Sequence, residues 1–198
     1  DSGGKPRVVD ASSDICGVTI DVSAHDVIYA GAQKNLGPSG VTLAILSPWA
    51  MARAKQGIPT MLDYHTHASK GSMFNTPNTF GIYVLDRVFA WIERNGGLDG
   101  AIERNRAKAA LLYGELDRSD FWRPHAHGGS RSVMNVTWRL ADENLEEAFL
   151  TEAVAAGFGG LKGHRSVGGI RASIYNGCPI ESVVALVGFM RDFESQHS

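Results

Sequence analysis

The chain has 198 residues, of which 43% are hydrophobic and 20% charged, and its formal net charge is −2 at pH 7. This composition is typical of a folded globular protein, gives no basic surface for nucleic acid, and contains no apolar run long enough to cross a bilayer. We therefore expect neither a nucleic-acid nor a membrane partner. Two cysteines, Cys16 and Cys178, are too few for a disulfide framework, so we expect a cytoplasmic protein.

The first part of the chain alternates β-rich runs with turn residues. We expect strands over residues 7–10, 26–31 and 40–47. The last of these is almost continuously apolar, as in a strand covered on both faces by helices. Ser47 and Pro48 are residue types of a helix N-cap and first helical position, and Gly57 predicts the end of that helix. Residues 58–80 follow neither period and carry turn residues throughout, so we expect a long ordered or semi-ordered loop there.

From Thr79 onward the apolar residues Phe80, Val84, Val88 and Trp91 follow a helical period, which ends at Asn95-Gly96-Gly97. Beyond this point the pattern predicts helix, strand, helix, strand and helix over residues 98–119, 132–140, 141–157, 168–176 and 179–193. This order is typical of a small α/β domain. We therefore expect an α/β protein of two domains, residues 1–96 and 97–198.

Several common motifs do not fit this sequence. The stretch "GAQKNLGPSG" has no Gly-Lys-Ser/Thr, so it is not a Walker phosphate loop, and "GFGGLKGH" has Lys162 where a dinucleotide fingerprint needs its third glycine. The pairs His65/His67 and His125/His127 lack a third ligand nearby, and we expect them to be loop histidines rather than a metal site.

Lys34 stands out because it lies between a short apolar run and a turn that contains Gly37, Pro38 and Gly40. A solvated lysine on a turn is one interpretation of this position. The other is a lysine at the end of a strand whose amine meets a ligand. Position alone leaves both open.

Five blocks of sequence resemble the phosphoserine aminotransferases, a pyridoxal-phosphate (PLP) family of the aspartate-aminotransferase fold group. In chain order they are "VVDASSDI", "VIYAGAQKNLGPSG", "GSMFNTPNTF", "MNVTWRL" and "LKGHRSVGGIRASIYN". The resemblance covers only the second half of such an enzyme. It implies that residues 1–96 are the C-terminal part of the PLP-binding large domain, with a mixed, mostly parallel sheet between helices, and that residues 97–198 are the small C-terminal α/β domain.

The resemblance also implies roles for cofactor-binding residues. Lys34 would form the Schiff base with PLP and carry the proton between the substrate and the cofactor. Asp10 would face the pyridine nitrogen, although a turn role beside the following serines stays open. Gln33 would bind the cofactor phosphate, and Asn75 and Thr76 would reach the phosphate of PLP in the other subunit of a homodimer.

On the substrate side, Arg171 would bind the α-carboxylate as a bidentate fork, and His164 and Arg165 would contact the phosphate end. A structural ion pair is the alternative for Arg171. The implied reaction is transamination of 3-phosphohydroxypyruvate with glutamate in serine biosynthesis, with 4-phosphohydroxythreonine as a second substrate left open. Two other interpretations are another PLP enzyme of this fold group and a catalytically silent chain, because the N-terminal half of the family pattern is missing.

Overall fold

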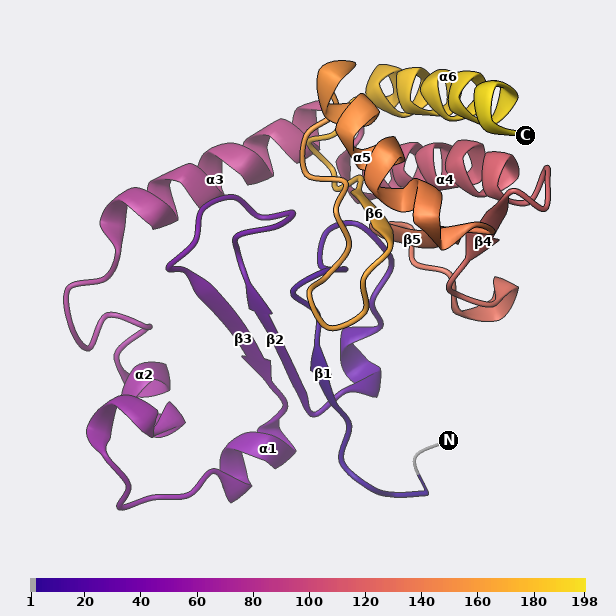
Figure 1. The fold of residues 1–198 in the computed structure, drawn as a ribbon. Helices are drawn as coiled ribbons and strands as arrows, with labels where there is room; N and C mark the ends of the chain where they lie inside the picture. The colour runs from indigo at the N-terminus through magenta and orange to yellow at the C-terminus, as the bar shows by residue number, and fades with distance from the viewer. Residues whose placement is uncertain (1–2) are drawn as a thin grey trace. The chain divides into compact units, whose positions relative to one another are not determined.

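The computed structural model describes residues 3–198, and the chain divides into two compact units, Asp1–Leu98 and Asp99–Ser198 (Figure 1). Each unit has its own three-stranded sheet and its own buried core. The division falls close to the domain boundary expected after residue 96. Among the described residues, none of the helices is both long enough and apolar enough to cross a lipid bilayer.

Unit 1 is built on a mixed sheet in the order β1-β2-β3. Its strands are β1 (Val8–Asp10), β2 (Val27–Gly31) and β3 (Thr42–Leu46), with a 3-10 turn η1 (Val22–Ala24) between the first two. Strands β1 and β2 run parallel with Asp10 opposite Tyr29, whereas β2 and β3 run antiparallel. Because β1 and β2 are parallel, both end at the same edge of the sheet, and the residues that follow them meet there.

The core of unit 1 is small and consists of Ala11, Ile15, Ile28, Ala30, Ala32 and Leu36. Side chains alternate along β2, so that Ile28 and Ala30 are buried while Tyr29 between them is exposed. In β3, Thr42 and Ala44 are exposed. Residues 3–198 therefore cover this apolar strand less completely than its sequence leads one to expect.

Helix α1 (Pro48–Arg53) begins where the sequence predicts. The hydroxyl oxygen of Ser47 accepts the N–H of Ala50 at 3.1 Å, and proline lies in the first turn. The helix ends before the predicted stop at Gly57, because Ala54 already leaves the helical conformation with ψ 129°.

The prediction of a loop over residues 58–80 is partly wrong. This segment contains the 3-10 turn η2 (Thr60–Leu62) and the short helix α2 (Tyr64–Ser69). The carboxylate of Asp63 accepts the N–H of His65 at 2.9 Å and so starts α2. A six-residue helix with no buried residues has no apolar stripe, and periodicity cannot reveal it.

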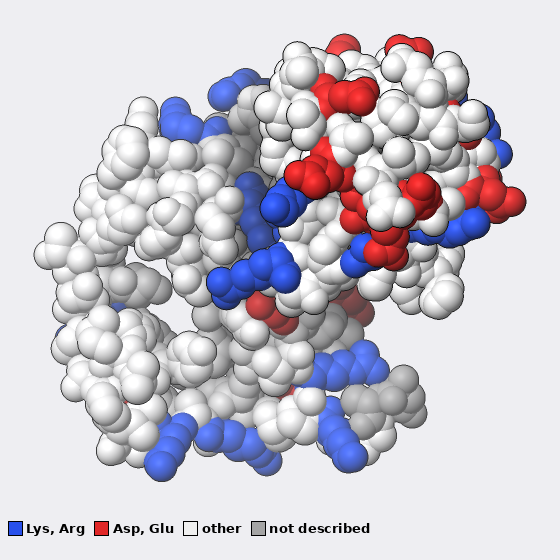
Figure 2. Space-filling model, viewed as in Figure 1, with Lys and Arg blue, Asp and Glu red and all other residues white. Residues whose placement is uncertain are grey.

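Helix α3 (Thr79–Arg94) closes unit 1. Val84 and Val88 pack over the turn after β2, where a Cβ on Gly37 would lie 3.6 Å and 3.4 Å from their methyl groups. The predicted apolar face is only partly buried, since Phe80 is 75% exposed. Figure 2 shows few charged side chains on the visible surface over α2 and the start of α3. Met73, Phe74, Phe80 and Ile82 are exposed in this part of the chain, so unit 1 presents an uncovered apolar face there.

Unit 2 is built on an antiparallel sheet in the order β4-β5-β6. Its strands are β4 (Trp122–Pro124), β5 (Asn135–Leu140) and β6 (Ile170–Ser173). The sequence predicts β5 and β6 but misses β4, because three residues ending in proline show no period. Proline is tolerated in β4 because this strand lies at the edge of the sheet.

Three helices gather on one side of this sheet (Figure 1). They are α4 (Gly97–Leu116), α5 (Glu146–Ala155) and α6 (Ile180–His197), with short 3-10 turns η3 (Gly128–Ser130) and η4 (Glu143–Leu145) in the connections. The core between sheet and helices is aromatic: Phe149 packs edge-to-face against Trp122, Trp138 and Phe193. All three helices are confirmed sequence predictions.

A buried lysine fastens α4 to the segment that follows β6. Lys108 is 2% exposed, and its Nζ donates to the carbonyl oxygens of Ile174, Tyr175 and Cys178 at 2.8, 2.7 and 3.0 Å. Burial lowers the pKa of this amine. Because each of its N–H groups has an acceptor, the ammonium group can be buried without an acidic partner.

Candidate active site

Two residues singled out in the sequence meet at one edge of the unit 1 sheet. Asp10 is the last residue of β1, and Lys34 lies in the turn that directly follows β2. The Nζ of Lys34 donates to the hydroxyl oxygen of Ser13 at 2.6 Å, and Ser13 lies in the turn after β1. The parallel pairing of the strands thus brings together the turn that follows Asp10 and the turn that carries Lys34, although the two turns are separated in sequence.

The Asp10 carboxylate is exposed and its environment favours the ionised form. Hydrogen bonds from the hydroxyl and backbone N–H of Ser12 lower the pKa of Asp10, and Tyr29 and the positive charge of Lys34 lower it further. The N–H of Ser12 lies 2.9 Å from Oδ1. Asp10 therefore does shape the turn with its neighbour, and it also presents a negative charge at the strand end.

The turn that carries Lys34 is held by a residue that sequence reasoning missed. Asn35 is buried and donates from Nδ2 to the carbonyl oxygens of Ile15 and Ser13 at 3.1 and 3.4 Å. Ser12 adds a second link by accepting the N–H of Gly31 at 3.0 Å. The sequence shows only that an asparagine directly follows the lysine, and its burial is visible in the structure alone.

Gln33 is exposed and precedes the lysine on the same turn. Its side-chain amide lies against Gly31, where an added Cβ would come within 2.4 Å of the Gln33 Oε1. Gln33 therefore lies at the same strand end as Lys34.

Asn75 and Thr76 lie on the segment between α2 and α3, and both are exposed. They line a cavity of about 710 Å³ together with Met73, Phe74, Pro77, Thr79 and Ile82. The Asn75 amide donates to the carbonyl oxygen of Thr76 at 3.1 Å, which is a contact within their own turn. No hydrogen bond described for residues 3–198 joins this pair to Asp10 or Lys34.

Unit 2 places its candidate residues on a single hairpin formed by residues 161–171. Lys162 and Ile170 pair as an isolated bridge, and the N–H of Gly163 donates to the carbonyl oxygen of Gly169 at 2.8 Å. A Cβ on Gly163 would lie 1.9 Å from the carbonyl oxygen of Gly168, so only glycine fits at this position. The hairpin carries His164 and Arg165 at its tip and Arg171 at its base.

The arginines of this hairpin have no acidic partner within residues 3–198. Arg165 is exposed, whereas Arg171 is half-buried and its Nε is buried without a hydrogen-bond partner among the described residues. His164 interacts through Nδ1 with the hydroxyl of Ser166 at 2.7 Å. The alternative of a structural ion pair for Arg171 therefore has no support in unit 2, and this group can accept an anionic ligand.

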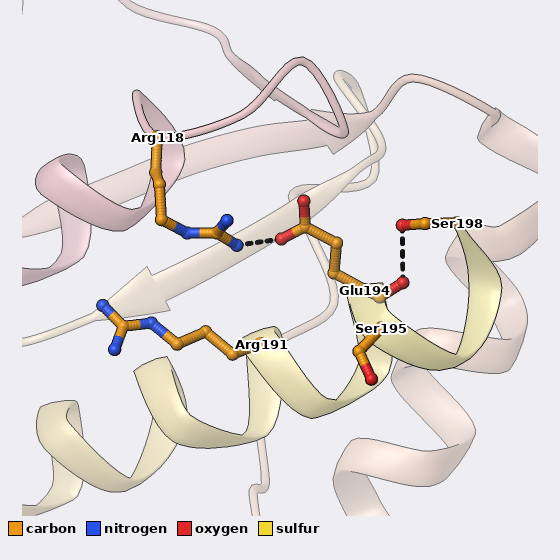
Figure 3. Close-up of a pocket in the computed structure, with 5 residues that line it drawn as sticks. All are labelled: Arg118, Arg191, Glu194, Ser195 and Ser198. Carbon is orange, nitrogen blue, oxygen red and sulfur yellow. Dashed lines mark hydrogen bonds and ion pairs between the residues drawn. The ribbon is translucent and has the colours of Figure 1, made fainter.

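Unit 2 has a cavity of about 560 Å³ that is lined by two arginines, Arg118 and Arg191 (Figure 3). The charges of both arginines are already paired. Arg118 forms ion pairs with Glu115 and Glu194, and the Nε of Arg191 donates to Glu115 at 2.7 Å. The Glu115 side chain is fully buried between them. This network connects α4 with α6, and we interpret it as structural.

The two histidine pairs show no metal-binding geometry. His65 Nδ1 lies 3.0 Å from Asp63 and His67 Nε2 lies 3.0 Å from the carbonyl oxygen of Met61. Within residues 3–198, no three histidine, cysteine, aspartate or glutamate side chains gather in an arrangement that could hold a metal ion.

Comparison with known proteins decides the family. The family described as aminotransferase class-V matches residues 4–186.

The chain belongs to the class-V aminotransferase family.

Among its relatives, the phosphoserine aminotransferase of Lysinibacillus sphaericus (strain C3-41) is 54% identical over all 198 residues, which correspond to 55% of that protein. A solved phosphoserine aminotransferase from Bacillus circulans subsp. alkalophilus superimposes with a TM-score of 0.95 at 49% identity, over 100% of this chain and 55% of that one. A PLP-bound phosphoserine aminotransferase from Trichomonas vaginalis gives a TM-score of 0.88 at 33% identity, over 95% of this chain and 54% of that one.

These matches confirm the resemblance and the α/β fold expected from the sequence, including the mixed sheet of unit 1. The class-V chain spans about half the length of the curated relatives that it matches.

Proposed function

We propose that this class-V chain is the C-terminal part of a phosphoserine aminotransferase, which transfers an amino group between glutamate and 3-phosphohydroxypyruvate in serine biosynthesis. The relatives above support this function, since they are phosphoserine aminotransferases that match the whole chain. The structural observation that carries it is the meeting of Asp10 and the Lys34 turn at the ends of two parallel strands.

The residues at this strand end fit pyridoxal 5'-phosphate. The Lys34 amine projects from a turn and has a hydroxyl as its hydrogen-bond partner rather than a carboxylate, so it can condense with an aldehyde without breaking an ion pair. Asp10 offers an ionised carboxylate, which suits a protonated ring nitrogen. Gln33 would donate to the cofactor phosphate, and the exposed Asn75 and Thr76 would bind the phosphate of the cofactor held by a partner subunit.

When bound, PLP supplies an electron sink for the electron pair that remains on the substrate Cα after deprotonation. Lys34 would take up that proton at Nζ and pass it to the cofactor within the same half-reaction. The carboxylate of Asp10 would keep a proton on the ring nitrogen of bound PLP, and the hydrogen bonds from Ser12 hold this carboxylate in place before the cofactor binds. The hydroxyl of Ser13 orients the Lys34 amine before the cofactor is attached.

The hairpin of unit 2 would hold the substrate. Arg171 would bind the α-carboxylate through two parallel N–H donors, which also fixes the Cα–H bond that must break. His164 and Arg165 at the hairpin tip would bind the phosphate. This cluster of basic groups without acidic partners among the described residues favours a substrate with two anionic groups, a carboxylate and a phosphate, over one with a single anionic group.

We further propose that the active enzyme is a cytoplasmic homodimer that includes the preceding half of the longer relatives. In this arrangement residues 1–96 complete the PLP-binding large domain and residues 97–198 form the small domain. The competing function is that of a chain that folds and associates without catalysis, and it predicts no covalent attachment of cofactor.

Chemical trapping tests the assignment. The chain is incubated with PLP, reduced with borohydride and digested, and the peptides are weighed. We expect the phosphopyridoxyl mass on the peptide that contains Lys34 and its absence from a Lys34→Ala variant. Label confined to Lys55, Lys70 or Lys162 would refute the role of Lys34.

A further inference from the structure

One arginine outside the candidate site contacts the hairpin that carries His164 and Arg165. Arg139 lies in β5, next to the edge strand β4, and its Nη2 donates to the carbonyl oxygen of Val167 at 2.7 Å. Val167 belongs to the four-residue turn at the tip, in which the carbonyl oxygen of His164 accepts the N–H groups of Val167 and Gly168 at 2.9 and 2.8 Å. The guanidinium therefore binds the outermost turn of the hairpin.

The stem of Arg139 also supports the returning arm of the hairpin. A Cβ on Gly169 would lie 3.1 Å from the Arg139 Cγ, and a Cβ on Gly168 would lie 2.9 Å from its Nη2. The two glycines therefore bring their backbone directly onto the arginine side chain. Without this side chain, the hairpin tip would lose both a hydrogen bond and its packing surface.

Two acids hold the guanidinium in this orientation. Its Nη1 donates to Glu143 in η4 at 2.9 Å and to Glu146, the first residue of α5, at 3.5 Å. The Glu146 side chain is 16% exposed and that of Arg139 is 36% exposed, so this pair is more rigid than a freely solvated one. With Nη1 bound to these acids, the Nη2 of the Arg139 guanidinium is directed at the carbonyl oxygen of Val167.

We propose that Arg139 is a positioning residue that holds the hairpin tip in the conformation that presents His164 and Arg165 to the phosphate of the substrate. The proposal rests on the proposed function for the identity of the ligand, but the anchoring itself does not. Arg139 acts through the hairpin backbone, and its charge is already balanced by Glu143 and Glu146. It therefore differs from Arg165 and Arg171, which have no such partner within residues 3–198.

The test compares Arg139→Met, which keeps the length of the stem but loses every donor, with Arg139→Lys, which keeps the charge and a single donor nitrogen. Arg123→Met is the matched control, because Arg123 lies directly opposite Arg139 on β4 and forms an exposed ion pair with Asp120 at 3.2 Å instead of a contact with the hairpin. Amide hydrogen exchange is measured on the 198-residue chain by mass spectrometry of the peptide that spans residues 161–171.

Loss of one hydrogen bond to a charged donor should speed exchange of the Val167 and Gly168 amides about tenfold in Arg139→Met. Arg139→Lys should recover part of this protection and Arg123→Met should match the wild type. Equal exchange in wild type and Arg139→Met overturns the proposal, as does an equal acceleration in Arg123→Met.

Kinetics of the enzyme assembled with its preceding half then separate positioning from general stability. In Arg139→Met, we expect KM for the phosphorylated substrate to rise about tenfold while kcat and KM for glutamate stay within about twofold. A fall in kcat with unchanged KM overturns the positioning role. A wild-type enzyme without transaminase activity would refute the proposed function instead, and the exchange comparison would still decide whether Arg139 anchors the hairpin.

Discussion

The role of Asp10 can be tested by a substitution that removes its charge and almost nothing else. Asparagine has the same shape as aspartate, and its Oδ1 can still accept the N–H of Ser12, which lies 2.9 Å from Asp10. Asp10 is exposed, so the substitution leaves no buried group without a partner. We therefore expect Asp10→Asn to change the free energy of unfolding by less than about 1 kcal/mol.

The catalytic cost should be much larger. The hydrogen bonds from Ser12 that lower the pKa of Asp10 keep its charge in place before substrate arrives. Removing a preorganised electrostatic partner of this kind costs about 3 to 4 kcal/mol of transition-state stabilisation, or roughly a few hundred- to a thousand-fold in rate. Attachment of PLP to Lys34 does not need this charge, so labelling and turnover should separate.

The assay measures transamination of 3-phosphohydroxypyruvate with glutamate by the protein assembled with its preceding half, together with borohydride labelling of Lys34. Asp14→Asn is the matched control, because Asp14 is an exposed acid in the same turn. We expect normal labelling in both variants and a steep loss of turnover only in Asp10→Asn. Normal turnover in Asp10→Asn would leave Asp10 with the turn role alone.

Two further outcomes follow from the structure. Burial alone would raise the pKa of Glu115, but hydrogen bonds from Arg118 and Arg191 outweigh this effect and lower the pKa below its usual 4.5. The ionised Glu115 therefore stabilises the folded protein above pH 4.5, and this stabilisation is lost as the pH falls through the pKa of the folded state. Urea denaturation followed by tryptophan fluorescence should therefore show that Glu115→Gln is less stable than wild type by about 2 kcal/mol at pH 7. On acidification, the free energy of unfolding should fall less in this variant than in wild type. Equal stability of the two proteins at pH 7 would contradict this interpretation of the network. Separately, the isolated chain should show no transaminase activity, because it spans only 55% of the Lysinibacillus sphaericus relative. Mixing it with an N-terminal half should restore activity. Full activity of the isolated chain would refute the need for that half.

Sequence patterns predicted well those features that depend on neighbouring residues. The start of α1 at Ser47-Pro48 and the strand ends at Asp10 and before Lys34 are local signals, and the structure has them where the sequence indicates. The edge strand β4 and the short helix α2 were missed because neither is long enough to show a period.

The contacts that hold the candidate site could not be predicted, because they join residues far apart in the chain. The hydrogen bonds of Lys34 to Ser13 and of Asn35 to Ile15 depend on the parallel pairing of β1 with β2. The contact of Arg139 with Val167 depends on β5 lying beside β6 and on the glycines that let the hairpin approach. No local pattern in the sequence encodes these distances.

The arginines of unit 2 show what the structure adds to the sequence. In sequence they are equivalent cations, and a basic residue near glycine suggests an anion site wherever it occurs. In the structure, Arg118 and Arg139 are each bound by two carboxylates, so accepting a further anion would require breaking ion pairs that hold helices and loops in place. Arg165 and Arg171 have no such pairs within residues 3–198, so their charge remains available. Arg165 and Arg171 both lie on the hairpin that Arg139 anchors, and for this reason we propose that the anionic substrate binds at this hairpin rather than in the arginine-lined cavity of Figure 3.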